Sequence, residues 1–190
     1  MGICESSKNQ TPQNEPAKKQ APKKIQDDIP LPDENLFKFN PNFFKYIDNI
    51  QKISIENKVY EGQMKDGKRN GKGRIYNMSD PFGDDVYEGE WKDDLKHGKG
   101  IYKYDKDFIY NGDWLYGKKE GKGYLKKPGI YYEGDWKNDT IEGRGKMIYI
   151  NENNKKEVYE GEFKDSQRHG KGIYKYNDGK IYNGEWKLGE

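Results

Sequence analysis

Five glycine pairs with the same nine-residue separation limit how this chain can fold more than any other feature of its sequence. The pairs are Gly62 and Gly71, Gly89 and Gly98, Gly112 and Gly121, Gly134 and Gly143, and Gly161 and Gly170. Each first glycine ends a Tyr-x-Gly segment, and each second glycine opens a Gly-x-Gly segment. Self-similarity of this kind is the signature of a repeat architecture. We therefore interpret the chain from Val59 onward as five repeats and a partial sixth, which begins at Ile181.

Within a repeat, the residues alternate as expected for a β-hairpin. Tyr87, Gly89 and Trp91 would point to one face of a strand, and the charged residues between them to the other. A turn follows at 93–97, and the segment from Gly98 returns as a second strand. Glycine normally weakens a strand, so its regular recurrence indicates that it leaves room for a Tyr or Trp ring over bare backbone. Five hairpins and one further strand predict about eleven antiparallel strands.

The overall composition is unusual for a folded chain. Only 31% of the residues are hydrophobic, 36% are charged and the mean hydropathy is −1.33, which by itself would suggest disorder. However, 14% of the residues are aromatic and 23 are glycines, and a sheet with rings packed over glycines needs little aliphatic core. We therefore predict an all-β fold: a single elongated, twisted antiparallel sheet of stacked hairpins, with a short N-terminal helix and a disordered N-terminal tail.

The repeats resemble the membrane occupation and recognition nexus (MORN) repeat family. The resemblance is carried by Tyr-x-Gly-x-Trp, with Met or Phe in place of Trp in some copies, followed by Gly-x-Gly, and it covers residues 59–190. The third copy departs from the others at Leu115-Tyr116-Gly117. The resemblance implies a scaffold that holds partners at membranes or in cytoskeletal assemblies, with repeats that are not catalytic themselves.

We predict three segments: a disordered, acylated tail at 1–32, a short capping or docking helix at 33–55, and the repeat sheet at 56–190. The first six residues fit the M-G-x-x-x-[ST] signature of N-myristoylation, with Gly2 as the acylated residue. Cys4 is the only cysteine and lies two residues from Gly2. Once Gly2 holds the chain at a bilayer, Cys4 is positioned for S-palmitoylation. One myristoyl chain binds a membrane only marginally, whereas two acyl chains hold stably.

The tail also contains more positively than negatively charged residues. It contains the lysines Lys8, Lys18, Lys19, Lys23 and Lys24, against Glu5 and Glu15. These lysines can contact anionic lipid, so we expect a cytoplasmic protein associated with the plasma membrane or a ciliary membrane. The alternative is that the signature occurs by chance and that the protein belongs to the cytoskeleton or cilium.

A helix is expected between the tail and the repeats. Asn40 and Pro41 have the preferences of an N-cap and a first helical position. The apolar residues Phe43, Phe44, Ile47, Ile50 and Ile53 follow at roughly helical spacing. Such a helix would cap the first hairpin or dock a partner or a bilayer.

The aromatic residues of the repeats are candidates for a partner-binding groove. They are Tyr60, Tyr87, Trp91, Tyr110, Trp114, Tyr132, Trp136, Tyr159 and Trp186. Aromatic rows favour the binding of an extended or helical peptide. The alternative is that these rings are simply the packing of the sheet.

The sequence gives no reason to expect catalysis, a cofactor, a metal or nucleic acid. His97 and His169 occupy a position that is filled by Asn or Glu in the other repeats, so it accepts many polar residues. One cysteine cannot build a Cys-based zinc site, and a net charge of +2 does not favour nucleic acid. The acidic and basic residues along the strands are expected to form cross-strand ion pairs.

Three functions are compatible with these features. The first is a non-enzymatic scaffold or adaptor at the cytoplasmic face of a membrane, the second a soluble cytoskeletal or ciliary structural protein, and the third a regulatory MORN module of a lipid-kinase-like system. The sixth copy lacks a returning strand, so Ile181–Lys187 is expected to have an open edge. That edge predicts a homodimer or partner docking through the C-terminal repeats, unless its charged residues keep the chain monomeric.

Overall fold

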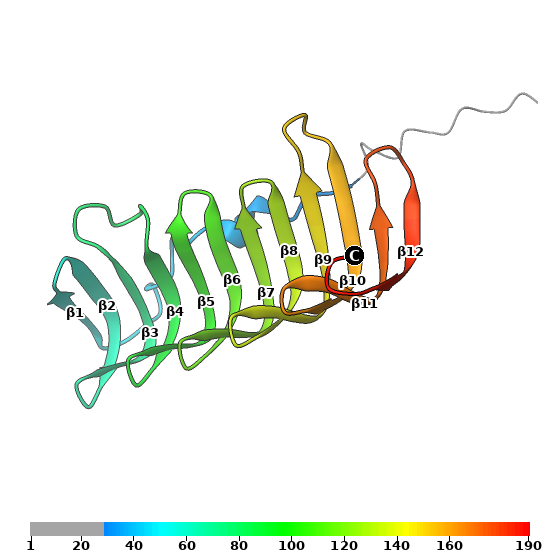
Figure 1. Cartoon of the computed structure of the whole chain (residues 1–190). Coiled ribbons are helices and arrows are strands. Elements are labelled where there is room, and N and C mark those ends of the chain that lie inside the picture. The colour runs from blue at the N-terminus through cyan, green and yellow to red at the C-terminus, as the bar shows by residue number, and fades with distance from the viewer. Residues whose placement is uncertain (1–28) are drawn as a thin grey trace, which may run out of the picture.

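The computed structural model describes residues 29–190 and forms one open antiparallel sheet of twelve strands (Figure 1). Each strand pairs with its neighbours in the chain, so sheet order equals sequence order. The strands are β1 (Ile50–Ile55), β2 (Lys58–Lys65), β3 (Lys68–Asn77), β4 (Val86–Lys92), β5 (Leu95–Asp105), β6 (Phe108–Leu115), β7 (Lys118–Lys127), β8 (Ile130–Lys137), β9 (Thr140–Ile150), β10 (Lys156–Lys164), β11 (Gln167–Lys175) and β12 (Ile181–Trp186). The all-β, single-sheet prediction is confirmed.

The predicted N-terminal helix is wrong. The one helix within residues 29–190 is a single 3-10 turn at Glu34–Phe37. After Asn40 the chain makes turns with i→i+3 bonds, such as Phe43 N–H to the Asn40 carbonyl at 3.1 Å. Strand β1 then begins at Ile50 and pairs with β2, which gives twelve strands instead of eleven. A short isolated helix is marginal in water, whereas the edge of β2 offers a ladder of backbone hydrogen bonds.

A row of glycines crosses the sheet. It confirms the prediction that the recurring glycines leave room for an aromatic ring. Each glycine of this row lies opposite the next one on the neighbouring strand. The row consists of Gly62, Gly73, Gly89, Gly100, Gly112, Gly123, Gly134, Gly145, Gly161, Gly172 and Gly184. A Cβ atom on Gly100 would lie 2.6 Å from Cε2 and Cζ of Tyr87. The tyrosine ring of each repeat therefore occupies the space that a side chain would need.

Each hairpin bends just below this glycine row. The β4–β5 register shifts between Gly89 and Glu90, and Gly98 has a φ of +55°, a backbone conformation that glycine adopts readily. The Glu90 carboxylate accepts the Lys99 N–H across the bulge at 3.2 Å. Bulges bend the strand that carries them, and Figure 1 shows the lower ends of the hairpins turned away from the upright upper parts.

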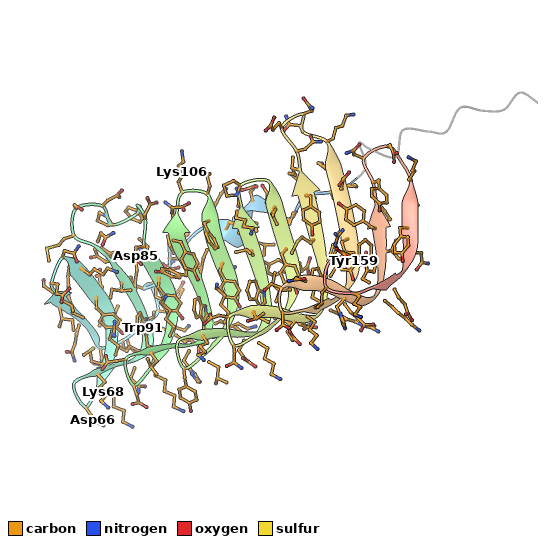
Figure 2. All side chains as sticks on the ribbon, in the orientation of Figure 1. Asp66, Lys68, Asp85, Trp91, Lys106 and Tyr159 are labelled. Carbon is orange, nitrogen blue, oxygen red and sulfur yellow. The ribbon has the colours of Figure 1, made fainter. Side chains whose placement is uncertain are left out.

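The lower turns bind one hairpin to the next. The Asp94 N–H donates to the Arg69 carbonyl at 3.1 Å, and the Gly117 N–H donates to the Lys96 carbonyl at 2.8 Å. Both central residues of the first of these turns, Asp93 and Asp94, have positive φ, as the two-residue hairpin turns that match strand twist require. Figure 2 shows Asp66 and Lys68 at this lower rim and Lys106 at the opposite, upper end.

The segment before β1, residues 29–47, lies across the sheet, and we call it the strap. Its contacts run from β10, where Lys156 Nζ donates to the Ile29 carbonyl at 2.8 Å, to β4, where Glu88 accepts the Asn40 N–H at 2.9 Å. Phe37 is 6% exposed and packs with Ile101 and Ile109. These strand residues lie on the face opposite the tyrosine rings, so the two faces are the ring face and the strap face. In Figure 1 the strap passes behind the strands.

No helix within residues 29–190 is long and apolar enough to cross a membrane.

Candidate functional site

The nine rings expected to line a groove are in the interior of the array. The five tyrosines of the set are at most 1% exposed, and the four tryptophans are between 4% and 7% exposed. Tyr87 packs edge-on against Trp91 and Trp114, with ring centroids 5.1 and 5.4 Å apart. Figure 2 shows Trp91 and Tyr159 among the side chains of the sheet.

Hydrogen bonds fix these rings in place. The Tyr87 hydroxyl donates to the Glu90 carbonyl at 2.9 Å, and the Tyr hydroxyl of every other repeat donates to the carbonyl three residues on. Trp91 Nε1 donates to the Gly73 carbonyl at 3.0 Å, and the other three tryptophans do likewise in the next repeats. The rings therefore have a packing role, and whether any of them also contacts a partner stays a prediction.

On the ring face, a row of residues lies over the rings, and we call it the covering row. The row occupies one equivalent position per repeat and consists of Arg69, Lys96, Lys119, Ile141 and Arg168. Lys96 Nζ lies 3.3 Å from the centroid of Tyr102 and 4.8 Å from that of Trp114. The four cations are thus placed on aromatic faces, where the ring quadrupole attracts them.

The two arginines of this row have hydrogen-bond acceptors. Arg69 Nε donates to Asp94 Oδ1 at 3.0 Å, and an Arg168 guanidinium nitrogen donates to the Gly189 carbonyl at 2.6 Å. The two lysines differ: among residues 29–190, neither Lys96 nor Lys119 forms an ion pair through Nζ. Burial lowers the pKa of Lys96 to about 8 and also lowers the pKa of Lys119.

The strap face carries alternating charge. Acidic residues on the Tyr-x-Gly strands pair with basic residues on the returning strands, as in the ion pairs of Lys99 with Asp113 and Lys122 with Asp135. The predicted cross-strand ion pairs are confirmed. A groove of about 750 Å³ runs over β7–β12 on this face, with glycines in its floor and charged residues such as Arg144 along its walls.

Arg74 and Glu88 form the least exposed ion pair on the strap face. Glu88 is 4% exposed and is held by the Arg74 guanidinium and the Asn40 N–H. The Arg74 guanidinium also lies 5.6 Å from the ring of Phe39, a strap residue. This pair therefore fixes the C-terminal part of the strap to β3 and β4.

The two histidines, His97 and His169, lie at equivalent positions of two repeats, each opposite a glutamate of its hairpin. His97 pairs with Glu90 across the hairpin, and its ring lies 5.1 Å from that of Tyr116. Nδ1 of His97 and Nδ1 of His169 are buried and have no hydrogen-bond partner among the described residues. Within residues 29–190 no group of three metal-ligating side chains comes together.

The repeats also match a known family. A model of the MORN repeat matches five stretches, at residues 60–76, 87–107, 110–128, 132–153 and 159–181, which together make up more than half of the chain. The chain belongs to the MORN repeat family. The family match and the hairpin register agree, since each matched stretch of this MORN protein begins at the buried tyrosine of a repeat. No curated protein matches the sequence.

The sequence analysis did not identify two elements of the site, the covering residues and the strap. Only the covering residues are recognisable in the sequence. The covering residues stand two positions before the first glycine of each Gly-x-Gly, as Lys96 stands before Gly98, so aligned repeats show a cation in four of the five copies and Ile141 in the fourth. The strap has no repeat and no periodicity that predicts its course. Gly2, Cys4 and the tail lysines lie outside the described residues, so the acylation predictions stay predictions.

Proposed function

We propose that this MORN protein is a non-enzymatic scaffold or adaptor that binds protein partners through its sheet at the cytoplasmic face of a membrane. MORN repeats are consistent with a repeat-based protein-interaction module. Membrane attachment through Gly2 and Cys4, supplemented by the tail lysines, is the further part of the proposal.

The observation that most supports partner binding is the strap. A segment that forms no strand, and whose one helix is the 3-10 turn at Glu34–Phe37, lies across seven strands, from β10 to β4. It is held by side-chain-to-backbone hydrogen bonds and by inserted aromatic rings. Asn111 Nδ2 donates to the Leu36 carbonyl at 2.8 Å, and Lys126 pairs with Glu34 at 2.8 Å. A surface that holds an extended segment of its own chain has the chemistry to hold a segment of another.

A continuous sheet is also a suitable scaffold because hydrogen bonds join each of its hairpins to the next. Each hairpin is joined to the next by a full ladder and by the turn contacts at the lower rim. At ~4.8 Å between strands, twelve strands extend over roughly 50 Å. Partners bound at different repeats would be held at fixed separations.

Membrane fractionation of cells that express full-length variants tests the anchoring. We expect the wild-type protein in the membrane fraction, Gly2→Ala in the soluble fraction, and Cys4→Ser with a shortened membrane residence. Gln10→Ala, which leaves the acylation signature intact, is the matched control and should behave as wild type. Equal membrane partitioning of wild type and Gly2→Ala would refute the anchor and favour the soluble cytoskeletal or ciliary role.

Self-association is a second part of the partner proposal. Strand β12 pairs with β11 on one side, and we propose that the C-terminal repeats are where a second copy or a partner docks. Light scattering of the full chain over a wide concentration range tests docking of a second copy, and a constant monomer mass would contradict self-association.

A further inference from the structure

Two neighbouring lysines on the ring face have features of an anion-binding site. Lys96 is in β5 and Lys119 is in β7, at equivalent positions of consecutive repeats. Each Nζ lies near three aromatic rings: those of Tyr87, Tyr102 and Trp114 for Lys96, and those of Tyr104, Tyr110 and Trp136 for Lys119. The rings remove water from the ammonium groups, but neither lysine is fully buried.

The nearby carboxylates, Asp85 and Asp139, attract the two ammonium groups, but neither forms an ion pair with the Nζ atom of Lys96 or Lys119. Asp85 pairs with Lys58 and accepts the Tyr102 hydroxyl. Asp139 Oδ1 accepts the backbone N–H of Lys119 at 2.9 Å. Within residues 29–190, neither ammonium group has a hydrogen-bonded carboxylate. Partial desolvation of such a group is costly, and an added carboxylate would reduce that cost through a charge-assisted hydrogen bond. The two arginines of the covering row do not need an added acceptor in this way, because each already donates a hydrogen bond to an oxygen of the chain.

The spacing of the two lysines indicates what kind of ligand reaches both. They are two strands apart, which at ~4.8 Å per strand is about 10 Å. A polyproline II segment has three residues per turn and rises ~3.1 Å per residue, so side chains at i and i+3 lie on one side about 9 Å apart. Two acidic residues at that spacing would place one carboxylate at each lysine.

Partly buried rings beside the lysines suit the rest of such a segment. Tyr104 lies between Tyr102 and Phe108, with ring centroids 4.1 and 4.5 Å apart. All three pack on the aromatic core and keep some exposed surface. Grooves lined by aromatic rings are the usual receptors of proline-rich segments, because a polyproline II helix is already ordered before it binds.

We propose that Lys96 and Lys119, with Tyr102, Tyr104 and Phe108, bind a proline-rich acidic segment of a partner protein that carries carboxylates three residues apart. This proposal rests on the proposed partner-binding function and assigns it to one place on the ring face.

A fluorescence anisotropy titration of the full chain tests the site. The probe is a fluorescein-labelled peptide of three Glu-Pro-Pro units, and the reference is the same peptide with Gln in place of Glu. We expect the Glu peptide to bind at least about tenfold more tightly than the Gln peptide, since only it supplies charge-assisted hydrogen bonds. A third peptide with its three Glu residues adjacent should bind more weakly than the first.

Two double variants distinguish binding at these two lysines from non-specific electrostatic attraction to the chain. Lys96→Met with Lys119→Met keeps the length of both side chains and removes both charges, and it should abolish the preference for Glu over Gln. Lys99→Met with Lys122→Met changes lysines of the same two strands on the opposite face, and it should retain that preference. Far-UV circular dichroism verifies that all variants keep the sheet.

Three results would overturn the proposal: no binding of the Glu peptide, equal binding of the Glu and Gln peptides, or wild-type binding by the Lys96→Met, Lys119→Met variant. None of them bears on membrane anchoring, which the Gly2→Ala fractionation decides separately. A failure of this site is therefore distinguishable from a failure of the anchored-scaffold function.

Discussion

Replacement of Gly100 by valine tests whether the glycine row is a packing device. The new Cβ would lie 2.6 Å from two ring carbons of Tyr87, a distance that real Cβ atoms essentially never show. Tyr87 is fully buried and packs between Trp91 and Trp114. The ring therefore cannot move without disturbing two further rings of the core.

The expected loss of stability follows from the contacts of Tyr87. Overpacking a well-packed core costs about 1–3 kcal/mol. Displacement of the ring also breaks the bond from the Tyr87 hydroxyl to the Glu90 carbonyl, which contributes about 0.5–1.5 kcal/mol. We expect Gly100→Val to lower the free energy of unfolding by about 2–4 kcal/mol, and the melting temperature by roughly 5–15 °C in a chain of this size.

Urea unfolding followed by tryptophan fluorescence is the appropriate assay, because Trp91 and Trp114 contact the affected ring. The matched control is Lys99→Val, one residue away, whose side chain is 73% exposed on the opposite face and pairs with Asp113. That exposed pair is worth about 0–1 kcal/mol, so the control should unfold near the wild-type midpoint. Equal midpoints for Gly100→Val and Lys99→Val would refute the packing argument.

Two further predictions concern the ring face. Phe163→Trp should stabilise the array by about 0.5–1.5 kcal/mol, since it adds the indole N–H that the four tryptophan-containing repeats donate to a glycine carbonyl; an unchanged or lower urea midpoint would show that the site has no room for it. The pKa of Lys96 is about 8 when folded, below its ordinary 10.5, so the unfolded chain binds more protons and stability should rise between pH 8 and pH 10. Lys96→Met should flatten that rise by about 1–2 kcal/mol, and identical pH profiles of wild type and variant would contradict the assignment.

The repeat array is predictable from the sequence because its signals are local and recur in every copy. The Tyr-x-Gly alternation, the turn residues and the nine-residue glycine spacing indicate the hairpins, and the structure has them. Ring-over-glycine packing is also predictable, since a residue that weakens strands would not recur in register without a steric reason. The burial of Tyr87 by its own hairpin and the next one is a direct consequence.

The conformation of the segment before the repeats was determined by tertiary contacts. The apolar residues from Phe43 to Ile53 fit helical spacing, yet Ile50–Ile55 is a strand, because the edge of β2 supplies hydrogen bonds that outweigh a weak local preference. Phe37 and Phe39 pack on the strap face. Nothing local in the sequence distinguishes these rings from those of an amphipathic helix.

The surface offered to a partner was likewise not determined by the sequence alone. The alternation of residues placed the aromatic rings on one face but could not show that the bent lower half of each hairpin would bring Lys96 over them. That bend comes from the bulge below each glycine and from turn contacts between residues more than twenty positions apart, such as Asp94 and Arg69. The sequence by itself determined which residues share the ring face. Only the tertiary structure decided that these rings are buried and what covers them, because covering is a contact between neighbouring repeats.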